Sequence, residues 1–401
     1  MGIQEKIKEI EFEMARTQKN KATEYHLGQL KARLAKLRTE LQLGQKTAKG
    51  EGEGFDVQRY GDGRVALIGF PSVGKSTLLT MLTGTNSESA AYEFTTLTCI
   101  PGILHYNDSK IQILDLPGII EGAASGKGRG RQVIACAKSS DLILMVLDAL
   151  KPWSHRDILT RELEAMGIRL NKKPPAITFK KKKTGGATIN STVPLTHLDD
   201  KLITRVLQEY KLHNCEILFK EDSTVDDLID VIEGNRRYIK CVYVYNKIDM
   251  LSIEEVDQIA RTPMSVPISC SGRLNLDGLL ERMWEEMALV RVYTKKVGHK
   301  PDFHEPVVLS EDRGGVLMEN FCSHIHQTLL RDFSYGLVWG TSSKHMPQRV
   351  GLTHALQDED VVQIVKKKVT AGVEEDKTSG NLAKRHQEAK DKAREKKPLK
   401  T

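Results

Sequence analysis

The sequence predicts an α/β fold: a mostly parallel sheet covered by helices, interrupted by a small inserted α+β subdomain, preceded by a helical hairpin and followed by a compact α+β module. Three observations support this prediction. Short apolar runs alternate with helical patterns, which is typical of parallel sheets. About 90 residues separate two of these runs, far more than a structureless loop spans. The first 50 residues repeat apolar side chains at helical spacing.

The N-terminal segment, residues 1–50, is predicted to form the helical hairpin. Ile3, Ile7, Ile10 and Met14 repeat at alternating steps of four and three, and leucines between 27 and 41 continue the pattern after a polar break. The apolar seam of such a hairpin must be buried. Two interpretations remain open: the seam binds a partner protein in a coiled coil, or it packs on the next domain.

The sheet domain is expected over residues 63–288, with an insertion at about 167–240. Its strands are predicted at 65–68, 110–114, 142–147, 241–245 and 266–269. The insertion follows a helix at 156–166 and contains a strand at 217–219 and the basic run Lys180–Lys183. This run either contacts RNA or is a solvated loop.

The C-terminal module is expected over residues 289–366. Strand-like segments at 307–309 and 337–339 flank a helix that carries Phe321, Ile325 and Leu329. Residues 367–401 hold too little apolar matter to fold alone, so we expect a basic, disordered tail.

Composition excludes several classes of protein. The chain has 401 residues, of which 39% are hydrophobic and 28% charged, which is typical of soluble globular proteins and not of collagen-like or disordered chains. No apolar stretch approaches the roughly 20 residues that span a bilayer. The six cysteines lack metal-ligand spacing. With no apolar signal core and no lipidation motif, we expect a cytoplasmic location and no membrane partner.

The positive charge is concentrated at the two ends. The net charge is +7, yet residues 1–50 hold 11 Lys and Arg against 6 Asp and Glu, and residues 366–401 hold 12 against 6. The middle of the chain is therefore acidic. The ends suit phosphate backbones or acidic partners, although solvated helical surface explains them equally well.

A phosphate-loop pattern, G-x-x-x-x-G-K-[ST], lies between the first predicted strand and a helix. Its residues are Gly69, Phe70, Pro71, Ser72, Val73, Gly74, Lys75 and Ser76, followed by Thr77. Glycines allow successive N–H groups and the helix N-terminus to face phosphates. Lys75 is expected to neutralise the β- and γ-phosphates, and the Ser76 hydroxyl to bind Mg²⁺.

A D-x-x-G motif follows the strand at 110–114. It comprises Asp115, Leu116, Pro117 and Gly118. We expect Asp115 to reach the magnesium ion and the Gly118 N–H to sense the γ-phosphate. Between the two motifs lies a threonine-containing segment, Phe94, Thr95, Thr96, Leu97 and Thr98. Thr96 is our choice to complete the magnesium coordination and bind the γ-phosphate, with Thr95 as its competitor.

A third motif selects the base. Asn246, Lys247, Ile248 and Asp249 follow the strand at 241–245. Guanine presents two N–H donors that the Asp249 carboxylate can accept together, and adenine lacks both. Asn246 is expected to hold the base and its loop, and the Lys247 stem to cover the ring. Within Ser269, Cys270 and Ser271, the Cys270 N–H is our candidate donor to the guanine carbonyl.

With these motifs, the sequence resembles the developmentally regulated GTP-binding proteins of the Obg superfamily, most closely their second eukaryotic branch. The resemblance covers nearly the whole chain, including residues 15–23 and 347–351. It implies a GTPase domain, a ubiquitin-like β-grasp module named TGS, association with ribosomes, and a stabilising DRG family regulatory protein. Potassium activation stays open, because relatives that use potassium commonly carry asparagine where this chain has Ser72.

The predicted function is therefore a GTP-hydrolysing, magnesium-dependent switch on ribosomes, with Lys75, Thr96 and Gly118 as catalytic residues. Ile119 and Ile120 follow Gly118 where many GTPases place a water-orienting glutamine, which predicts slow intrinsic turnover. The alternative is a ribosome- or RNA-binding scaffold in which GTP only stabilises the fold. An ATP-dependent phosphotransferase is disfavoured, since Asp249 suits guanine.

Overall fold

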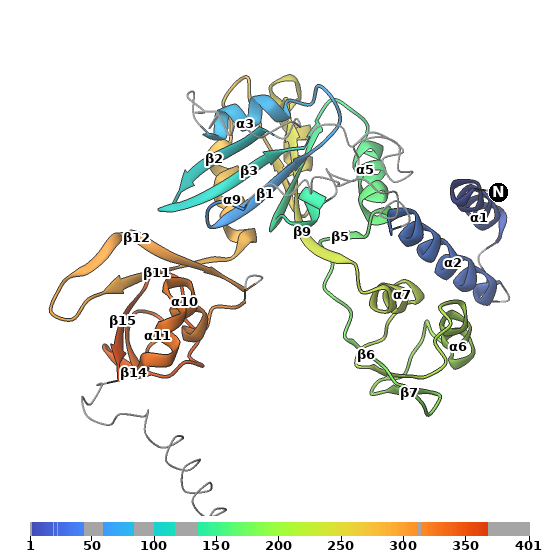
Figure 1. The fold of residues 1–401 in the computed structure, drawn as a ribbon. Coiled ribbons are helices and arrows are strands. Elements are labelled where there is room, and N and C mark those ends of the chain that lie inside the picture. Colours follow the sequence, from blue (N-terminus) through green and yellow to red (C-terminus); the bar gives the residue numbers. More distant parts are fainter. Residues whose placement is uncertain are drawn as a thin grey trace, which may run out of the picture.

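The computed structural model describes residues 2–18, 20–21, 23–43, 59–83, 100–116, 135–311 and 314–367. Within these residues the strands form three sheets, and each sheet packs against its own helices (Figure 1). The fold is thus the predicted α/β arrangement with an insertion, N-terminal helices and a C-terminal α+β module.

The largest sheet has seven strands in the order β10-β9-β4-β1-β3-β2, with β5 paired to β9. All pairs are parallel except that of β2 with β3. The strands are β1 (Gly63–Ile68), β2 (Ile100–Tyr106), β3 (Ser109–Asp115), β4 (Leu142–Asp148), β5 (Ile168–Leu170), β9 (Arg237–Asn246) and β10 (Ser265–Pro267). Every residue of β1 and β4 is buried, which explains why both read as continuous apolar runs.

Helices cover both faces of this sheet. Side chains of α3 (Lys75–Thr83) and α9 (Leu276–Met287) fill the core on one face. Those of α5 (Ser154–Ala165) and α8 (Ile253–Ala260) fill the core on the other. A short 3₁₀ helix, η2 (Ile248–Met250), precedes α8.

The insertion is a separate small subdomain between β5 and β9. Its three-stranded sheet, in the order β6-β8-β7, packs two helices on one face. The elements are β6 (Ile177–Lys181), β7 (Ala187–Ser191), α6 (Asp200–Glu209), β8 (Cys215–Phe219) and α7 (Val225–Glu233). The lysine run is therefore not wholly a loop, since Lys180 and Lys181 are the last two residues of β6. This segment forms a strand because its alternate residues Ile177 and Phe179 pack against the core of the subdomain.

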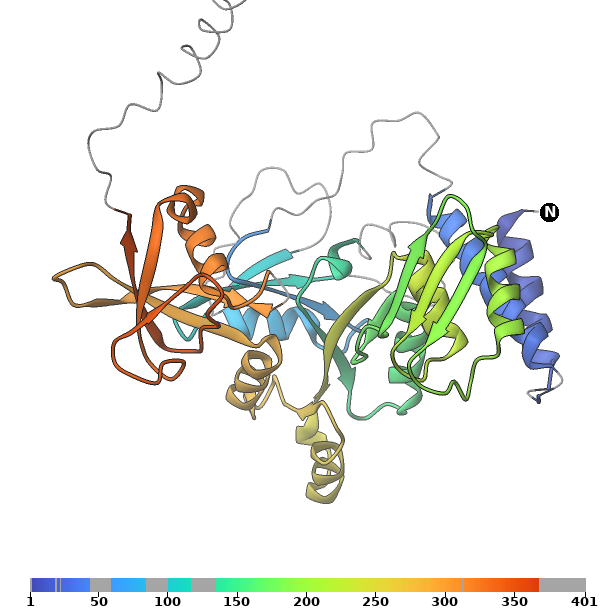
Figure 2. The same ribbon diagram turned by 90° about the horizontal axis from the view of Figure 1, so that it is seen from below.

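Of the two N-terminal helices, α2 (Glu24–Leu43) lies against the insertion and α1 (Ile3–Arg16) packs on α2 (Figure 2). Ala32 and Ala35 of α2 belong to the core of the subdomain. A Cβ at Gly28 would stand 2.7 Å from the Leu202 side chain, so glycine permits the close approach of α2 to α6. The seam of α2 is thus buried within this chain, in a subdomain remote in sequence.

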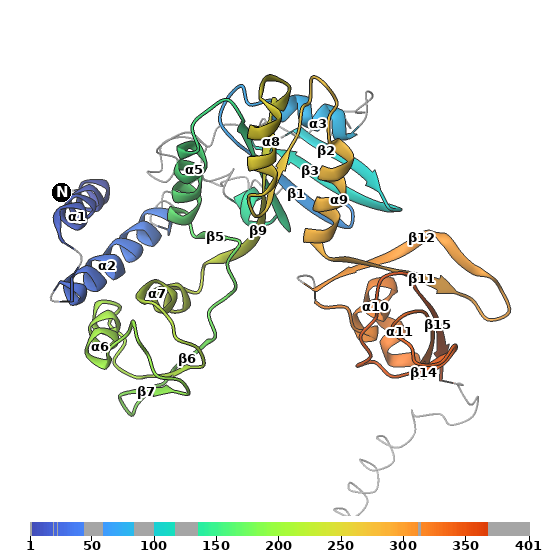
Figure 3. The same ribbon diagram turned by 180° about the vertical axis from the view of Figure 1, so that it is seen from behind.

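The C-terminal module continues from α9 (Figure 3). Its five-stranded sheet has the order β12-β11-β15-β13-β14, with a central parallel pair between β11 and β15. The elements are β11 (Leu289–Lys295), β12 (Pro301–Ser310), α10 (Met318–Ile325), α11 (Gln327–Asp332), β13 (Phe333–Trp339), β14 (Gln348–Val350) and β15 (Asp360–Lys366). None of the described helices of the chain has the length and apolar character needed to cross a membrane.

Candidate nucleotide site

The predicted motifs meet at one edge of the large sheet. β1, β3, β4 and β9 are parallel, so their carboxyl ends lie side by side. The phosphate loop follows β1, Asp115 ends β3, and Asn246 ends β9. Open parallel sheets bind ligands at this edge, where loops and helix N-termini converge. The structure therefore brings together three motifs that lie far apart in the sequence.

The phosphate loop curls through backbone conformations that glycine favours. Gly74 has φ of 94° and Ser72 has φ of 63°. A Cβ at Gly69 would collide with the Val146 carbonyl oxygen of β4, so the loop can leave the sheet this closely only with glycine there. The Leu78 N–H donates to the Gly74 carbonyl at 2.9 Å, so α3 starts directly from the loop. Thr77 is exposed in its first turn.

Lys75 folds back over the phosphate loop. Its ammonium donates to the carbonyl oxygens of Gly69 and Phe70 at 3.0 and 2.9 Å. Burial lowers the pKa of Lys75, and the charge of Asp115 partly opposes this shift. The Lys75 ammonium group therefore lies at the phosphate loop, where phosphate oxygens could replace the two carbonyl oxygens as its hydrogen-bond acceptors.

Ser76 and Asp115, two of the residues predicted to bind magnesium, lie in contact with each other. The Ser76 hydroxyl donates to Asp115 Oδ2 at 2.8 Å. Asp115 is 6% exposed, and its Oδ1 is buried without a hydrogen-bond partner among the described residues. A buried carboxylate oxygen without a partner is costly unless something else satisfies it. A carboxylate and a hydroxyl are ligands that Mg²⁺ accepts, so these residues fit the ion.

Asn246 connects the phosphate loop to the base-binding loops. Its side-chain amide donates to the Val73 carbonyl at 2.9 Å. Its Oδ1 accepts the N–H groups of Lys247 at 2.9 Å and Cys270 at 3.1 Å. These bonds make Asn246, which is 3% exposed, a strut between loops. Only one of the two amide N–H groups is used in these contacts, so the expectation that Asn246 also holds the base stays a prediction.

The Cys270 N–H has a partner within the site. It donates to Asn246 Oδ1 at 3.1 Å, and sequence spacing does not show this contact. Ser271, next in the chain, is exposed and has no such bond from its N–H among the described residues. The role of the Cys270 N–H toward the guanine carbonyl stays a prediction, with the Ser271 N–H as a second candidate.

Asp249 is oriented by two serine hydroxyls. Ser269 and Ser271 donate to its Oδ1 at 2.6 and 3.2 Å. The Ser269 hydrogen bond is the main cause that lowers the pKa of Asp249, so the side chain stays ionised at neutral pH. An exposed carboxylate held in one orientation suits the paired donors of guanine. Ile248 lies between Lys247 and Asp249, half-buried.

Asp148 is a site residue that the sequence analysis missed. The Lys247 ammonium lies 2.7 Å from Asp148 Oδ2, and the Leu150 N–H donates to Oδ1 at 3.1 Å. Burial alone would raise the pKa of Asp148, but these two groups outweigh it and hold the pKa below its ordinary value. Lys247 has φ of 71°, so its backbone bends sharply while its side chain is tied down. The sequence feature that could have indicated Asp148 is its position as an aspartate at the end of the buried strand β4.

A pocket of about 520 Å³ opens between these loops. Its lining residues are Phe70, Pro71, Ser72, Val73, Asp148, Leu150, Lys151, His155 and Lys247. Leu116 closes the sheet beneath the site: it is fully buried, and its N–H donates to the Leu67 carbonyl at 3.2 Å. The other predicted site residues lie outside the described residues: Phe94, Thr95, Thr96, Leu97, Thr98, Pro117 and Gly118.

Comparison with known proteins agrees with this geometry. Residues 64–181 match a family model described as a 50S ribosome-binding GTPase, residues 184–289 one described as the C-terminal region of the MMR_HSR1 domain, and residues 290–366 the TGS domain. Developmentally-regulated G-protein 1 of Arabidopsis thaliana is 71% identical over 368 residues, 92% of each chain. Human developmentally-regulated GTP-binding protein 2 is 61% identical over 367 residues, 92% of this chain and 100% of that protein.

The chain belongs to the developmentally regulated GTP-binding protein family. It is therefore a GTP-binding protein with a GTPase domain, a class of domain that hydrolyses GTP, and its C-terminal module is the TGS domain. This confirms the fold class and the family resemblance inferred from the motifs. In this family member, the strut at Asn246 and the Asp148–Lys247 pair support the base-binding loop.

Replacing Asp148 with Asn should weaken GTP and GDP binding equally, by about three- to tenfold. The variant keeps the shape of the side chain but removes the charge that holds Lys247, and a hydrogen bond to a charged group contributes about 1.5–3 kcal/mol, discounted here because Lys247 is 35% exposed. Titration with a fluorescent guanine nucleotide measures the change. Asp257→Asn, which alters an exposed pair with Arg261, should leave affinity unchanged. Unaltered binding by D148N would refute the positioning role.

Proposed function

We propose that this protein is a slow, magnesium-dependent GTPase that acts as a switch on the translation machinery in the cytoplasm. The observation that carries the proposal is the Ser76–Asp115 pair beside Lys75, with a buried carboxylate oxygen left for a cation.

Ser76 and Asp115 would hold magnesium, together with Thr96 as proposed from the sequence. When bound, the ion neutralises charge on the β- and γ-phosphates of the nucleotide. Lys75 would leave the carbonyls of Gly69 and Phe70 and donate to phosphate oxygens, while the loop N–H groups orient the same phosphates. The Gly118 N–H is proposed to contact the γ-phosphate.

Slow turnover follows from the residues after Gly118. Ile119 and Ile120 carry no group that accepts or donates a proton, so neither orients the attacking water. Water must then be positioned by the backbone or by a group that a partner supplies. We propose that the ribosome or a DRG family regulatory protein provides this help.

Association with ribosomes is supported by the matching family model, which is described as a 50S ribosome-binding GTPase. The basic ends of the chain are compatible with it, since lysine and arginine supply affinity for phosphate backbones without sequence preference. Potassium activation is only tested, by comparing hydrolysis in potassium and in sodium salt, because this chain has Ser72 where relatives that use potassium commonly carry asparagine.

Single-turnover hydrolysis should be slow for the isolated chain and faster with ribosomes. We expect Ser76→Asn to abolish hydrolysis, because a bulkier amide replaces the hydroxyl that faces Asp115, and removal of magnesium with a chelator to do the same. Radiolabelled phosphate release measures the rate, in sodium and in potassium salt. Thr80→Asn, one turn further along α3 and exposed, is the matched control. Fast hydrolysis without ribosomes contradicts the slow-switch proposal, and unimpaired ribosome binding with no hydrolysis favours the scaffold.

A further inference from the structure

A cluster of basic side chains lies at one end of the inserted sheet. β6 runs antiparallel to β8, with Lys181 opposite Cys215, and β7 runs parallel to β8, with Ala187 opposite Cys215. The turn after β6 and the loop before β8 therefore meet at the same end, on the side of the molecule away from α3 (Figure 1). We call this cluster the basic tip; its members are Lys180, Lys181, Lys182, Lys183, Lys211 and His213.

Asn214 fastens the two loops of the basic tip. Its Oδ1 accepts the Gly186 N–H at 2.9 Å, and its Nδ2 donates to the Lys183 carbonyl at 3.1 Å. Backbone bonds from Lys182 to Asn214 and from Cys215 to Gly186 complete the junction, at 3.0 and 3.2 Å. The lysines thus project from an ordered junction, and ordering them on a ligand costs less entropy than in a free loop.

The charge of the basic tip is largely unbalanced. All six members are exposed. Lys182 pairs with Glu216 at 3.1 Å, and both side chains are 40% exposed, so the pair is weak. Among the described residues, no ion pair involves Lys180, Lys181, Lys183 or Lys211. The tip therefore presents a positive potential that an anionic partner can neutralise.

The chemistry of the tip distinguishes between anionic partners. Protein interfaces are centred on aromatic or large apolar side chains and are depleted in lysine. None of the exposed large hydrophobic residues among those described lies in the tip. Gly185 and Gly186 have nothing within 4 Å of where a Cβ would stand, so the backbone beside the lysines is open to close approach. The Gly186 N–H is already bonded to Asn214, so the lysine ammonium groups, which an approaching phosphate can reach, supply the donors.

We infer that the basic tip binds the sugar-phosphate backbone of RNA. This inference rests on the proposed association with ribosomes and extends it. It assigns one RNA-contacting surface to the insertion. The contact is electrostatic and independent of base sequence, because lysine side chains without base-reading partners recognise phosphates only. The tip would act as an anchor, separate from the nucleotide site.

The test compares RNA binding of the full chain with that of a Lys181→Gln, Lys183→Gln, Lys211→Gln variant. Fluorescence anisotropy with a labelled RNA duplex of mixed sequence is measured from 50 to 200 mM KCl. Loss of three phosphate contacts should make the slope of log K against log salt shallower by about 2 to 3 and weaken binding at 0.1 M salt about a hundredfold. The basic chain ends are identical in both proteins, so the difference reports on the tip.

The matched control carries Lys172→Gln, Lys173→Gln and Lys220→Gln, three exposed lysines outside the tip, one of which follows the far end of β8. It should bind RNA like the wild type. An equal loss in control and tip variants, unchanged binding by the tip variant, or no RNA binding by the wild type would each overturn the inference. Polyglutamate competing as well as RNA would instead indicate an acidic protein partner and also overturn it. GTP turnover, measured in parallel, should be normal in the tip variant, so failure of the GTPase proposal would be recognised separately.

Discussion

Replacing Asp249 with Asn is expected to weaken GTP binding by about 10²- to 10⁴-fold and to shift preference to xanthosine triphosphate. Two charge-assisted hydrogen bonds to guanine are lost, each contributing about 1.5–3 kcal/mol. Ser269 and Ser271 hold Oδ1, so the amide oxygen of the variant can keep these bonds. The new NH₂ group then occupies the position of Oδ2, where it repels the guanine amino group and can donate to the carbonyl of xanthine.

Competition titration of the purified chain with GTP, XTP and ATP measures this change of specificity. Asp257→Asn is a control for the charge removed, since its carboxylate lies on exposed α8 and pairs with Arg261. Tight ATP binding by the wild type would contradict the assignment of the base pocket, as would XTP binding no better to D249N than to the wild type. Because the pKa of Asp249 is lowered, this carboxylate stays ionised between about pH 8 and 5, so it contributes no pH dependence to GTP binding in that range.

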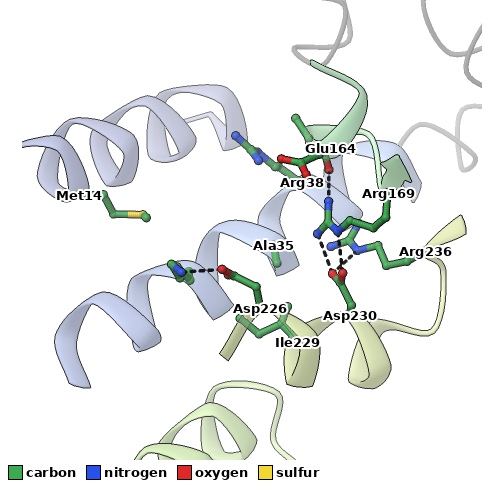
Figure 4. A pocket seen from close by; sticks show the side chains of 11 residues that line it. Met14, Ala35, Arg38, Glu164, Arg169, Asp226, Ile229, Asp230 and Arg236 are labelled. Atoms are coloured by element: carbon green, nitrogen blue, oxygen red, sulfur yellow. Dashed lines mark hydrogen bonds and ion pairs between the residues drawn. The ribbon is translucent and has the colours of Figure 1, made fainter. Parts of the chain in front are cut away.

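Replacing Asp230 with Ala is expected to destabilise the junction between the insertion and the sheet domain by about 3–5 kcal/mol. Asp230 is 5% exposed and lies between two arginines (Figure 4). Arg169 donates to both of its oxygens, at 2.7 and 2.8 Å, and Arg236 lies 3.1 Å from Oδ1. Alanine would leave two buried guanidinium groups without their carboxylate.

The neighbourhood makes this loss more severe. Lys138 lies close by, and its pKa is lowered by burial and by the charges of Arg236 and Arg237. Removing the buried Asp230 carboxylate from this group of cations leaves repulsion that water screens poorly. Thermal unfolding and hydrogen exchange across α7 and β5 should detect the loss, since a chain of several domains does not unfold in one step.

Asp226→Ala is the matched control for Asp230→Ala. Asp226 also lies on α7 and pairs with Lys31 at 2.7 Å, but the two side chains are 56% and 38% exposed, so its removal should cost less than about 1 kcal/mol. Combining Asp230→Leu with Arg169→Met and Arg236→Met should restore most of the stability, because the two guanidinium groups that need the Asp230 carboxylate are then absent. Equal effects of D230A and D226A would show that the buried network adds nothing.

The sequence predicted those parts of the fold and the site in which local pattern and local structure coincide. The phosphate loop, Asp115 and the base motif each follow a buried strand, so parallel pairing alone brings them to one edge. The positions of Asp148 and Asp230 were not predictable in this way. Asp148 meets Lys247 across 99 residues of sequence, and Asp230 meets Arg169 across 61. Pairing between individual side chains at such separations depends on packing, which periodicity does not encode.

The same reason explains two other differences. The apolar seam of α2 was recognised, but its occupant was not, because α6 and α7 become its partners only after the insertion folds. The Cys270 amide was predicted to reach guanine because the tripeptide follows a strand, and that pattern did not show its contact with the Asn246 side chain, 24 residues away. Local sequence identified the segments, and long-range packing decided their partners.

The contact between α2 and the insertion affects the order in which a nascent chain can mature. Lys31 and Asp226, which pair in the folded protein, are separated by 195 residues. At ordinary translation rates, about 10 to 40 s pass between the synthesis of these two residues. Until the insertion has been made, the apolar stripe of α2 lacks its final cover, so the first segment to be synthesised is buried only after a segment 195 residues later has followed it.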